Sequence, residues 1–222
     1  MRTPLHAIHG YTDLMRMDLS ALDPALLQQA RSYPGQILRS CRSLLRILDT
    51  MFTFVTWADR EYRPELEQAT ASDLVDQVLS EFNEDVTEKK LQIATSLPHT
   101  LAFSTDPKML VLALRQLIDN AIKFTPEGGQ IMISGGLRGD TIVEIVVTDS
   151  GQGFAKETAE QAFNPFERLS YEASSTPGVG MGLSLARAAM QRINGRVLID
   201  QSESGAKVRL ELPASAWPPS IQ

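Results

Sequence analysis

The sequence lacks the features that mark nucleic-acid-binding, disulfide-bonded and membrane-spanning proteins. Its 222 residues carry 21 lysines and arginines against 27 aspartates and glutamates, with no basic stripe to neutralise phosphates. The one cysteine, Cys41, cannot form a disulfide within the chain. No apolar run approaches the roughly 20 residues that span a bilayer, and the first residues lack a signal-peptide pattern. We therefore expect a cytoplasmic chain, or the cytoplasmic part of a larger protein, that contacts neither nucleic acid nor membrane.

The first sixty residues show the spacing of two successive amphipathic helices. Apolar residues recur at steps of three and four over Leu5–Leu22, where Thr12 is the polar exception, and again over Ile37–Val55. Asp23-Pro24 suits a helix start, while Pro34-Gly35 suits either a kink or the start of the second helix. A lone hairpin leaves its seam half covered. Pairing with a second copy into a four-helix bundle is therefore expected, with docking onto the rest of the chain as the alternative.

The rest of the chain alternates between strand and helix patterns after a joint at Ala58–Pro64. We expect an extended segment at Tyr62–Leu66, helices at Ser72–Glu88, Pro107–Phe124 and Ser184–Asn194, and strands at Leu91–Thr95, Ile131–Ser134, Thr141–Thr148, Arg196–Asp200 and Val208–Leu212. This order predicts an α+β protein: a helical hairpin over residues 1–60, an α/β sandwich over 61–215 and a loose tail over 216–222.

Within the second part, Arg115–Phe124 places three polar side chains on one face of a predicted helix. Gln116, Asn120 and Lys123 are four and three residues apart. The amide oxygen of Asn120 suits Mg²⁺, and the Lys123 ammonium suits phosphate. A solvated polar face is the alternative interpretation of these residues taken alone.

The segment Thr148–Gly153 places a carboxylate and two glycines at the end of a predicted strand. Asp149 can accept a hydrogen bond from an adenine amino group, and Gly151 and Gly153 let the backbone pass close to a flat base. A plain glycine turn is the alternative.

Two further segments complete the pattern. Phe163–Arg168 sets aromatic rings, Phe166 among them, on either side of a proline, where they either hold a loop or form a small hydrophobic cluster. Pro177–Leu183 leads into a predicted helix, whose first N–H groups suit phosphate. Its glycines are Gly178, Gly180 and Gly182, followed by Leu183.

In order and spacing, these four segments resemble the signature boxes of the sensor histidine kinases of two-component systems. They match the asparagine box (Arg115–Phe124), the aspartate box (Thr148–Gly153), the phenylalanine box (Phe163–Arg168) and the second glycine box (Pro177–Leu183). The resemblance implies a Bergerat-type ATP-binding fold shared with gyrase and mismatch-repair ATPases. The phenylalanine box is particular to the kinases, which argues against a gyrase-type ATPase.

The resemblance assigns roles residue by residue. Asp149 corresponds to the adenine-reading carboxylate, Asn120 to the Mg²⁺ ligand and Lys123 to the phosphate contact, and the glycines of the boxes to backbone contacts with ATP. Gln116 stands where asparagine is usual, which leaves its metal contact open. Lys207 stands where a small hydroxyl residue is common, so the closing box, Ser204–Val208, is expected to contribute little.

At the N-terminus, Arg2-Thr3-Pro4-Leu5 resembles the end of the phosphoacceptor box. The phosphorylated histidine of that box precedes the arginine by three residues, so we expect it to be missing from this chain, and a phosphatase role is implied for Thr3. The resemblance implies a homodimeric protein-histidine kinase that passes phosphate from Mg-ATP to a hairpin histidine and then to a response-regulator receiver domain. The alternative is an ATP-binding dimeric adaptor that binds response regulators without autophosphorylation, and this chain alone is expected to be inactive in autophosphorylation.

Overall fold

The computed structural model describes residues 62–99, 102–139, 141–155, 158–167, 180–202 and 204–214, and within the first sixty residues 8, 10–12, 33–35, 37–38, 41, 44–45 and 48. The chain divides into two units, residues 1–60 with 177–179, and the remainder. Every described residue of the first unit is helical, and the rings of Tyr11 and Tyr33 stack with centroids 5.3 Å apart. The complete hairpin, its pairing into a bundle and the domain boundaries stay predictions.

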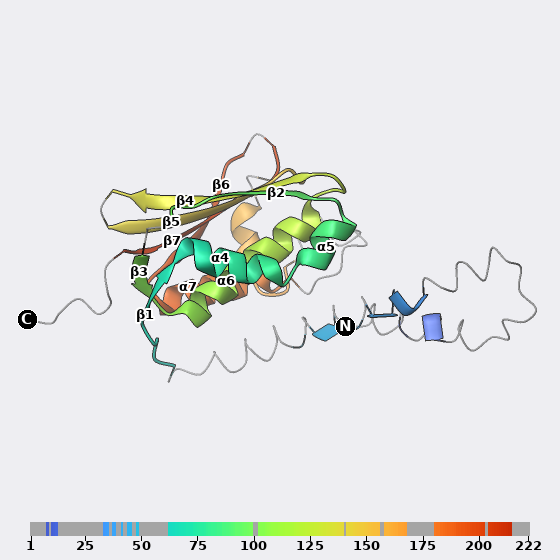
Figure 1. Cartoon of the computed structure of the whole chain (residues 1–222), viewed down its shortest axis with the longest axis horizontal. Helices are drawn as coiled ribbons and strands as arrows, with labels where there is room; N and C mark the ends of the chain where they lie inside the picture. The colour runs from blue at the N-terminus through green and yellow to red at the C-terminus, as the bar shows by residue number, and fades with distance from the viewer. Residues whose placement is uncertain are drawn as a thin grey trace, which may run out of the picture. The chain divides into compact units, whose positions relative to one another are not determined.

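The second unit is built on a five-stranded mixed sheet (Figure 1). In spatial order its strands are β2 (Gln92–Ser96), β4 (Gln130–Arg138), β5 (Ile142–Asp149), β7 (Lys207–Pro213) and β6 (Arg196–Asp200). β2 runs parallel to β4, and the other neighbours are antiparallel. A separate antiparallel pair joins β1 (Glu67–Thr70) to β3 (Ala102–Thr105).

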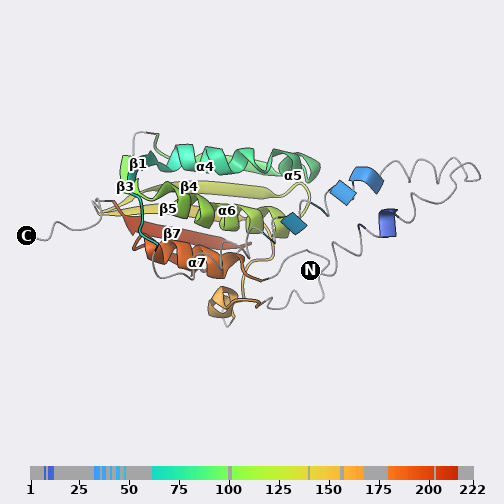
Figure 2. The same cartoon turned by 90° about the horizontal axis from the view of Figure 1, so that it is seen from below.

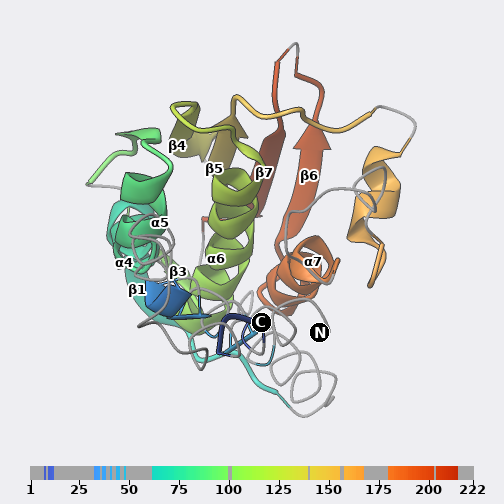
Figure 3. The ribbon, with the colours of Figure 1, turned by 90° about the vertical axis from the view of Figure 1, so that its right-hand side faces the viewer.

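One face of this sheet is covered by helices, with α6 (Pro107–Phe124) at the centre (Figures 2 and 3). The other helical elements are α4 (Ala71–Ser80), α5 (Asn83–Glu88), the 3-10 helix η2 (Ala159–Phe163) and α7 (Gly182–Arg192). Figures 2 and 3 show α6 between α4 and α7, and in Figure 3 these helices lie below the strands. In the part of the chain that the structure describes, no helix is both long and apolar enough to cross a membrane.

The central position of α6 follows from its sequence. Pro107 occupies its first turn, and the side chain of Asp106 caps its N-terminus by accepting hydrogen bonds from the amides of Lys108 (3.0 Å) and Met109 (3.2 Å). Apolar side chains then lie on most sides of the helix and are buried against its neighbours. The C-terminal turns of α6 therefore hold their polar side chains in a fixed place.

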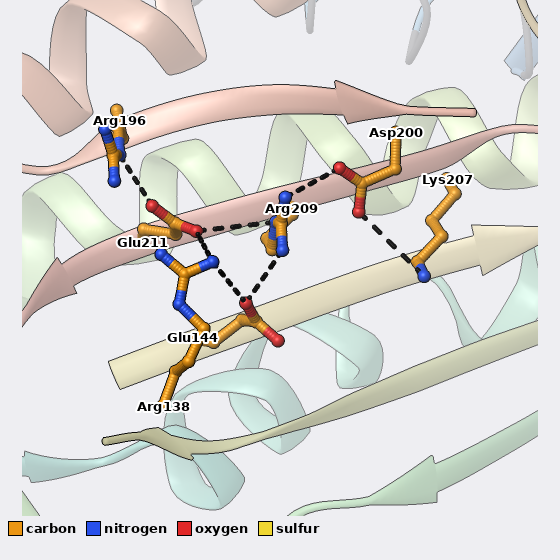
Figure 4. Close-up of polar contacts among 7 residues, drawn as sticks. All are labelled: Arg138, Glu144, Arg196, Asp200, Lys207, Arg209 and Glu211. Carbon is orange, nitrogen blue, oxygen red and sulfur yellow. Dashed lines mark hydrogen bonds and ion pairs between the residues drawn. The ribbon is translucent and has the colours of Figure 1, made fainter. Parts of the chain in front are cut away.

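Among the described residues of this unit, the opposite face of the sheet carries charged side chains instead of a helical cover (Figure 4). Seven side chains on β4, β5, β6 and β7 form one network of ion pairs (Figure 4): Arg138, Glu144, Arg196, Asp200, Lys207, Arg209 and Glu211. At its centre Glu211 is only 2% exposed, and its carboxylate oxygens lie 2.8 Å from Arg138 Nη1 and 2.6 Å from Arg196 Nε. The guanidinium groups cover the carboxylate that the sheet would otherwise leave facing water.

The mixed architecture predicted from the sequence is confirmed, with local differences. The single helix expected over Ser72–Glu88 is wrong, because the chain turns at Glu81-Phe82 and buries Phe82 between α4 and α5. The extended segment expected at Tyr62–Leu66 precedes the actual strand β1, and its partner β3 was not predicted. Short strands with few apolar residues give little periodic signal.

Candidate functional site

The polar face of the asparagine box lies at the C-terminal end of α6. Gln116 is buried, and Asn120 and Lys123 are half-buried on the following turns. Lys123 pairs with the carboxylate of Asp119, one turn earlier on the same helix. Both amides lie against the second glycine box, because a methyl group at Gly182 would lie 3.2 Å from Gln116 Oε1 and 3.4 Å from the amide atoms of Asn120. The second glycine box thus packs against the asparagine box.

Asp149 ends strand β5 and is 8% exposed. Its Oδ1 accepts hydrogen bonds from the backbone amides of Gly151 (2.8 Å) and Ala206 (3.2 Å). Burial raises the pKa of Asp149, and the two amide hydrogen bonds partly offset that rise. The carboxylate is therefore fixed in direction by backbone donors that use only one of its two oxygens.

The closing box holds the aspartate box in place, which corrects the expectation that it contributes little. Gly205 has a φ of +72°, and a methyl group there would lie 1.7 Å from the carbonyl oxygen of Asp149. The amide of Asp149 donates to the carbonyl of Ala206 at 2.9 Å. Lys207, the departure noted in the sequence, points to the other face of the sheet and lies 3.9 Å from Asp200. The closing box contacts Asp149 through its backbone, so these contacts do not depend on which side chain stands at position 207.

The phenylalanine box is joined to the second glycine box by the backbone. The amide of Phe166 donates to the carbonyl of Gly180 at 2.9 Å. Its two rings behave differently: Phe163 is buried beneath the guanidinium of Arg187, 3.6 Å from the ring centroid, whereas Phe166 is 61% exposed. The two rings therefore do not lie in one buried cluster, and Phe163 with Arg187 anchors this segment to α7.

The asparagine, aspartate and second glycine boxes thus converge on the C-terminal turns of α6, and the phenylalanine box is joined to them through Gly180. Gly151 lies against this end, since a methyl group there would lie 2.6 Å from the carbonyl oxygen of Phe124. Gly153 lies against the closing box, since a methyl group at Gly153 would lie 2.3 Å from the carbonyl oxygen of Gly205. Leu183 is buried in the first turn of α7. Thr3 and Gly178, also predicted from the sequence, lie outside the described residues.

The donor set at this cluster suits a magnesium nucleotide. Within the described ranges no three His, Cys, Asp or Glu side chains gather into a metal site, so Mg²⁺ would depend on amide oxygens and phosphate. Gln116 and Asn120 offer such oxygens, next to the start of α7. The N-cap of that helix, Met181, makes no side-chain capping hydrogen bond. Its first N–H groups point where the helix dipole favours an anion.

Comparison with known proteins identifies the family. Residues 105–216 match the family described as "Histidine kinase-, DNA gyrase B-, and HSP90-like ATPase", and the chain belongs to it. It is 28% identical over 221 residues to histidine protein kinase DivJ of Caulobacter vibrioides, covering 98% of this chain and 36% of DivJ. It is 30% identical over 213 residues to the adaptive-response sensory kinase SasA of a Nostoc species, covering 92% of this chain and 52% of SasA.

A solved structure agrees with these relatives. The catalytic domain of histidine kinase ThkA superposes with a TM-score of 0.61 at 25% identity, covering 68% of this chain and 99% of that one. The resemblance is confirmed: the chain carries the catalytic ATP-binding domain of a two-component sensor histidine kinase. It spans about a third of the length of DivJ and about half of SasA.

Proposed function

We propose that this chain is the core of a sensor histidine kinase that binds Mg-ATP at the end of α6 and donates its γ-phosphoryl group to a histidine. The observation that carries the proposal is the convergence of three sequence segments on one place, with a buried carboxylate, two amide side chains and an ammonium around it, while the phenylalanine box is joined to them through Gly180. Each of these groups has a partner on an adenine nucleotide.

Asp149 would read the adenine base. Its Oδ1 is taken by the amides of Gly151 and Ala206, and a carboxylate oxygen accepts more than one hydrogen bond. The adenine amino group would donate to the Oδ2 side of this group. Because the carboxylate is nearly buried and held by two amides, it is preorganised, and a base that lacks the amino group leaves it without a donor.

The phosphate end would be held by α6 and the start of α7. Asn120 would supply an oxygen ligand to Mg²⁺, with Gln116 beside it, and Lys123 would contact phosphate oxygens in competition with its present partner Asp119. Bound Mg²⁺ supplies positive charge that balances the charge of the transferred group. Gly178, Gly180 and Gly182 would present backbone N–H groups, and Phe166 and Leu183 would border the nucleotide.

The wider function follows from the family and stays part of the proposal. The phosphoryl group would pass from a histidine of a dimeric helical hairpin to an aspartate of a response-regulator receiver domain, in the cytoplasm, where ATP is available. Such transfer depends on positioning and charge more than on covalent chemistry. Detection of phosphohistidine after incubation with ATP, in a form of the protein that includes the phosphoacceptor histidine, would separate a kinase from an ATP-binding adaptor, which would show none.

Calorimetric titration with Mg-ATP tests the binding step. Asp149→Asn replaces an acceptor by an amide whose NH₂ opposes the adenine amino group, so we expect binding to weaken by about 1–3 kcal/mol. Glu160→Gln, on the exposed side of η2, is the matched control and should bind as the wild type does. Equal affinity of the wild type and Asp149→Asn would count against the assignment of the adenine site.

A further inference from the structure

A lysine outside the candidate site holds the end of the helix that carries it. Lys89 lies in the turn between α5 and β2. Its Nζ donates hydrogen bonds to three backbone carbonyls, those of Ile122 (2.6 Å), Lys123 (3.1 Å) and Thr125 (2.6 Å). An ammonium group has three N–H donors, so this half-buried side chain uses all of them on one helix end.

These contacts complete the C-terminus of α6. The last four carbonyls of an α-helix have no partner within the helix. In α6 the carbonyl of Ala121 accepts from the amide and the hydroxyl of Thr125, at 3.0 Å and 2.6 Å, while Lys89 takes the next two carbonyls. A cation at this end also balances the negative pole of the helix dipole. Lys89 is therefore a C-terminal cap supplied from a distant part of the chain.

The turn that Lys89 caps is the one from which the proposed phosphate contact projects. Lys123 is the last but one residue of α6, where an uncapped helix frays. Its carbonyl is held by Lys89, and the next carbonyl, that of Phe124, lies against Gly151. Fixing this backbone fixes the point from which the long Lys123 side chain reaches out.

We propose that Lys89 is a positioning residue for the phosphates of the bound nucleotide, acting through the backbone of Lys123 without touching the ligand. This inference rests on the proposed function, in which Lys123 contacts phosphate. The adenine end makes no hydrogen bond to Lys89, because both donors to Asp149 are the backbone amides of Gly151 and Ala206. The effect of losing Lys89 should therefore fall on the phosphates and spare the base.

The neighbouring lysine gives a matched control. Lys90 is one residue further along, but its side chain is 75% exposed and pairs with Glu127, which is also exposed. Replacing either lysine by methionine removes one positive charge from the same turn and keeps an unbranched side chain of similar length. Only Lys89→Met removes hydrogen bonds from the end of α6.

The experiment measures the affinities of Mg-ATP and of adenosine by calorimetry for the wild type, Lys89→Met, Lys90→Met and Lys89→Arg, each shown by circular dichroism to be folded at the temperature used. We expect Lys89→Met to bind Mg-ATP about tenfold more weakly or worse, with adenosine within about twofold of the wild type. Lys90→Met should match the wild type for both ligands. Lys89→Arg keeps the charge, but the planar guanidinium does not fit three converging carbonyls. Its affinity for Mg-ATP should therefore lie between those of the wild type and Lys89→Met.

A ratio of ATP to adenosine affinity that is unchanged in Lys89→Met would overturn the inference, whether or not the variant melts at a lower temperature. An equal loss for both ligands would do the same, since it indicates a general structural role. If Lys89→Met does not fold, the same comparison is made with Lys89→Arg, and an unchanged ratio there is decisive. Failure of the wild type and Lys90→Met to bind Mg-ATP would instead refute the proposed function.

Discussion

The backbone amide of Ala206 donates a 3.2 Å hydrogen bond to Oδ1 of Asp149, across a separation of 57 residues in the chain. The pair is reciprocal, since the amide of Asp149 donates to the carbonyl of Ala206. This contact joins the ends of two neighbouring strands, β5 and β7, so the register of the sheet sets the direction of the carboxylate. The candidate adenine site is therefore a product of sheet pairing and not of a flexible loop.

The first prediction concerns stability without nucleotide. Because burial raises the pKa of Asp149, its proton is bound more tightly in the folded state, and its ionisation opposes folding. Stability should therefore fall as the pH rises from the unfolded value of about 3.9 through the raised folded pKa. Asp149→Asn removes this loss, and its amide oxygen can still accept from both backbone amides.

Urea unfolding of the nucleotide-free protein checks this. We expect Asp149→Asn to be more stable than the wild type at pH 7, with the difference shrinking as the pH is lowered toward 4. Saturating Mg-ATP should reverse the order at pH 7, because only the wild type gains strongly from binding. A variant that is less stable than the wild type at neutral pH without nucleotide would contradict the argument.

A second prediction compares two glycines with similar backbone conformations. Gly205 and Gly139 have φ values of +72° and +60°, so alanine costs about 1–2 kcal/mol of strain at either position. At Gly139 nothing lies within 4 Å of the added methyl group, whereas at Gly205 it would meet the carbonyl oxygen of Asp149 at 1.7 Å. We expect Gly205→Ala to cost about 1–3 kcal/mol more in urea unfolding and to lose ATP binding. Similar losses in the two variants would show that the close approach is not needed.

A third prediction concerns the ion-pair network on the open face of the sheet. Glu211→Ala leaves Arg138 and Arg196 without their shared carboxylate, and Arg209 loses one of its neighbours at 3.5 Å. Because both Arg138 and Arg196 are about half exposed and can be hydrated, we expect a moderate loss of about 1–3 kcal/mol in the free energy of unfolding.

The control for this network is an exposed pair. Glu160, 85% exposed, pairs with Arg187 at 3.0 Å, and Glu160→Ala should change stability by less than about 0.5 kcal/mol. Equal effects of Glu211→Ala and Glu160→Ala would mean that the network behaves as ordinary surface charge.

A fourth prediction is that His6 is not a phosphoacceptor. The resemblance places the acceptor histidine seven residues earlier, which in a helix is about 10 Å along the axis at about 1.5 Å per residue. Phosphoryl transfer requires reacting atoms about 3–3.5 Å apart, so a displacement of this size is prohibitive. Incubation of the chain with γ-labelled ATP should give no acid-labile, base-stable label on His6. Label that disappears in His6→Ala but persists in His9→Ala would refute this.

The fifth prediction is that Thr3 helps to dephosphorylate a response regulator, because it matches the threonine that follows the phosphoacceptor in the family. Its hydroxyl would orient the attacking water. A Thr3→Ala variant of the full-length protein should clear phosphate from its regulator more slowly while binding ATP unchanged. Clearance at the normal rate would remove the assignment and leave Thr3 as an ordinary small residue at a helix start.

The sequence predicted features that depend on local pattern and on the boxes themselves. The bounds of α6 follow from Pro107 at its start and from apolar periodicity to Phe124, and both are confirmed. The break at Glu81-Phe82 was missed because the apolar spacing continues across it. Gly205 and Ala206 were undervalued because their contribution is backbone geometry, which side-chain identity does not report.

Lys89 left no signal in the sequence at all. It is one of two adjacent lysines in a polar turn, and the two cannot be told apart until the end of α6 is placed beside one of them. Contacts between elements that are distant in the chain depend on how helices and strands pack. Periodicity and motif spacing therefore cannot predict such contacts.

The hydrogen bond between the amide of Phe166 and the carbonyl of Gly180 also affects how far the sequence between these residues can change without loss of domain stability. This hydrogen bond joins two backbone positions that are far apart in the chain and so closes a loop at its base. Closing a loop costs free energy that grows slowly with length, about 0.6 kcal/mol for each doubling. Insertions, deletions or a grafted reporter peptide at residues 168–176, before the second glycine box, should therefore cost the sheet and helices little stability, which makes these positions a natural place for new partner specificity to arise on an unchanged catalytic domain.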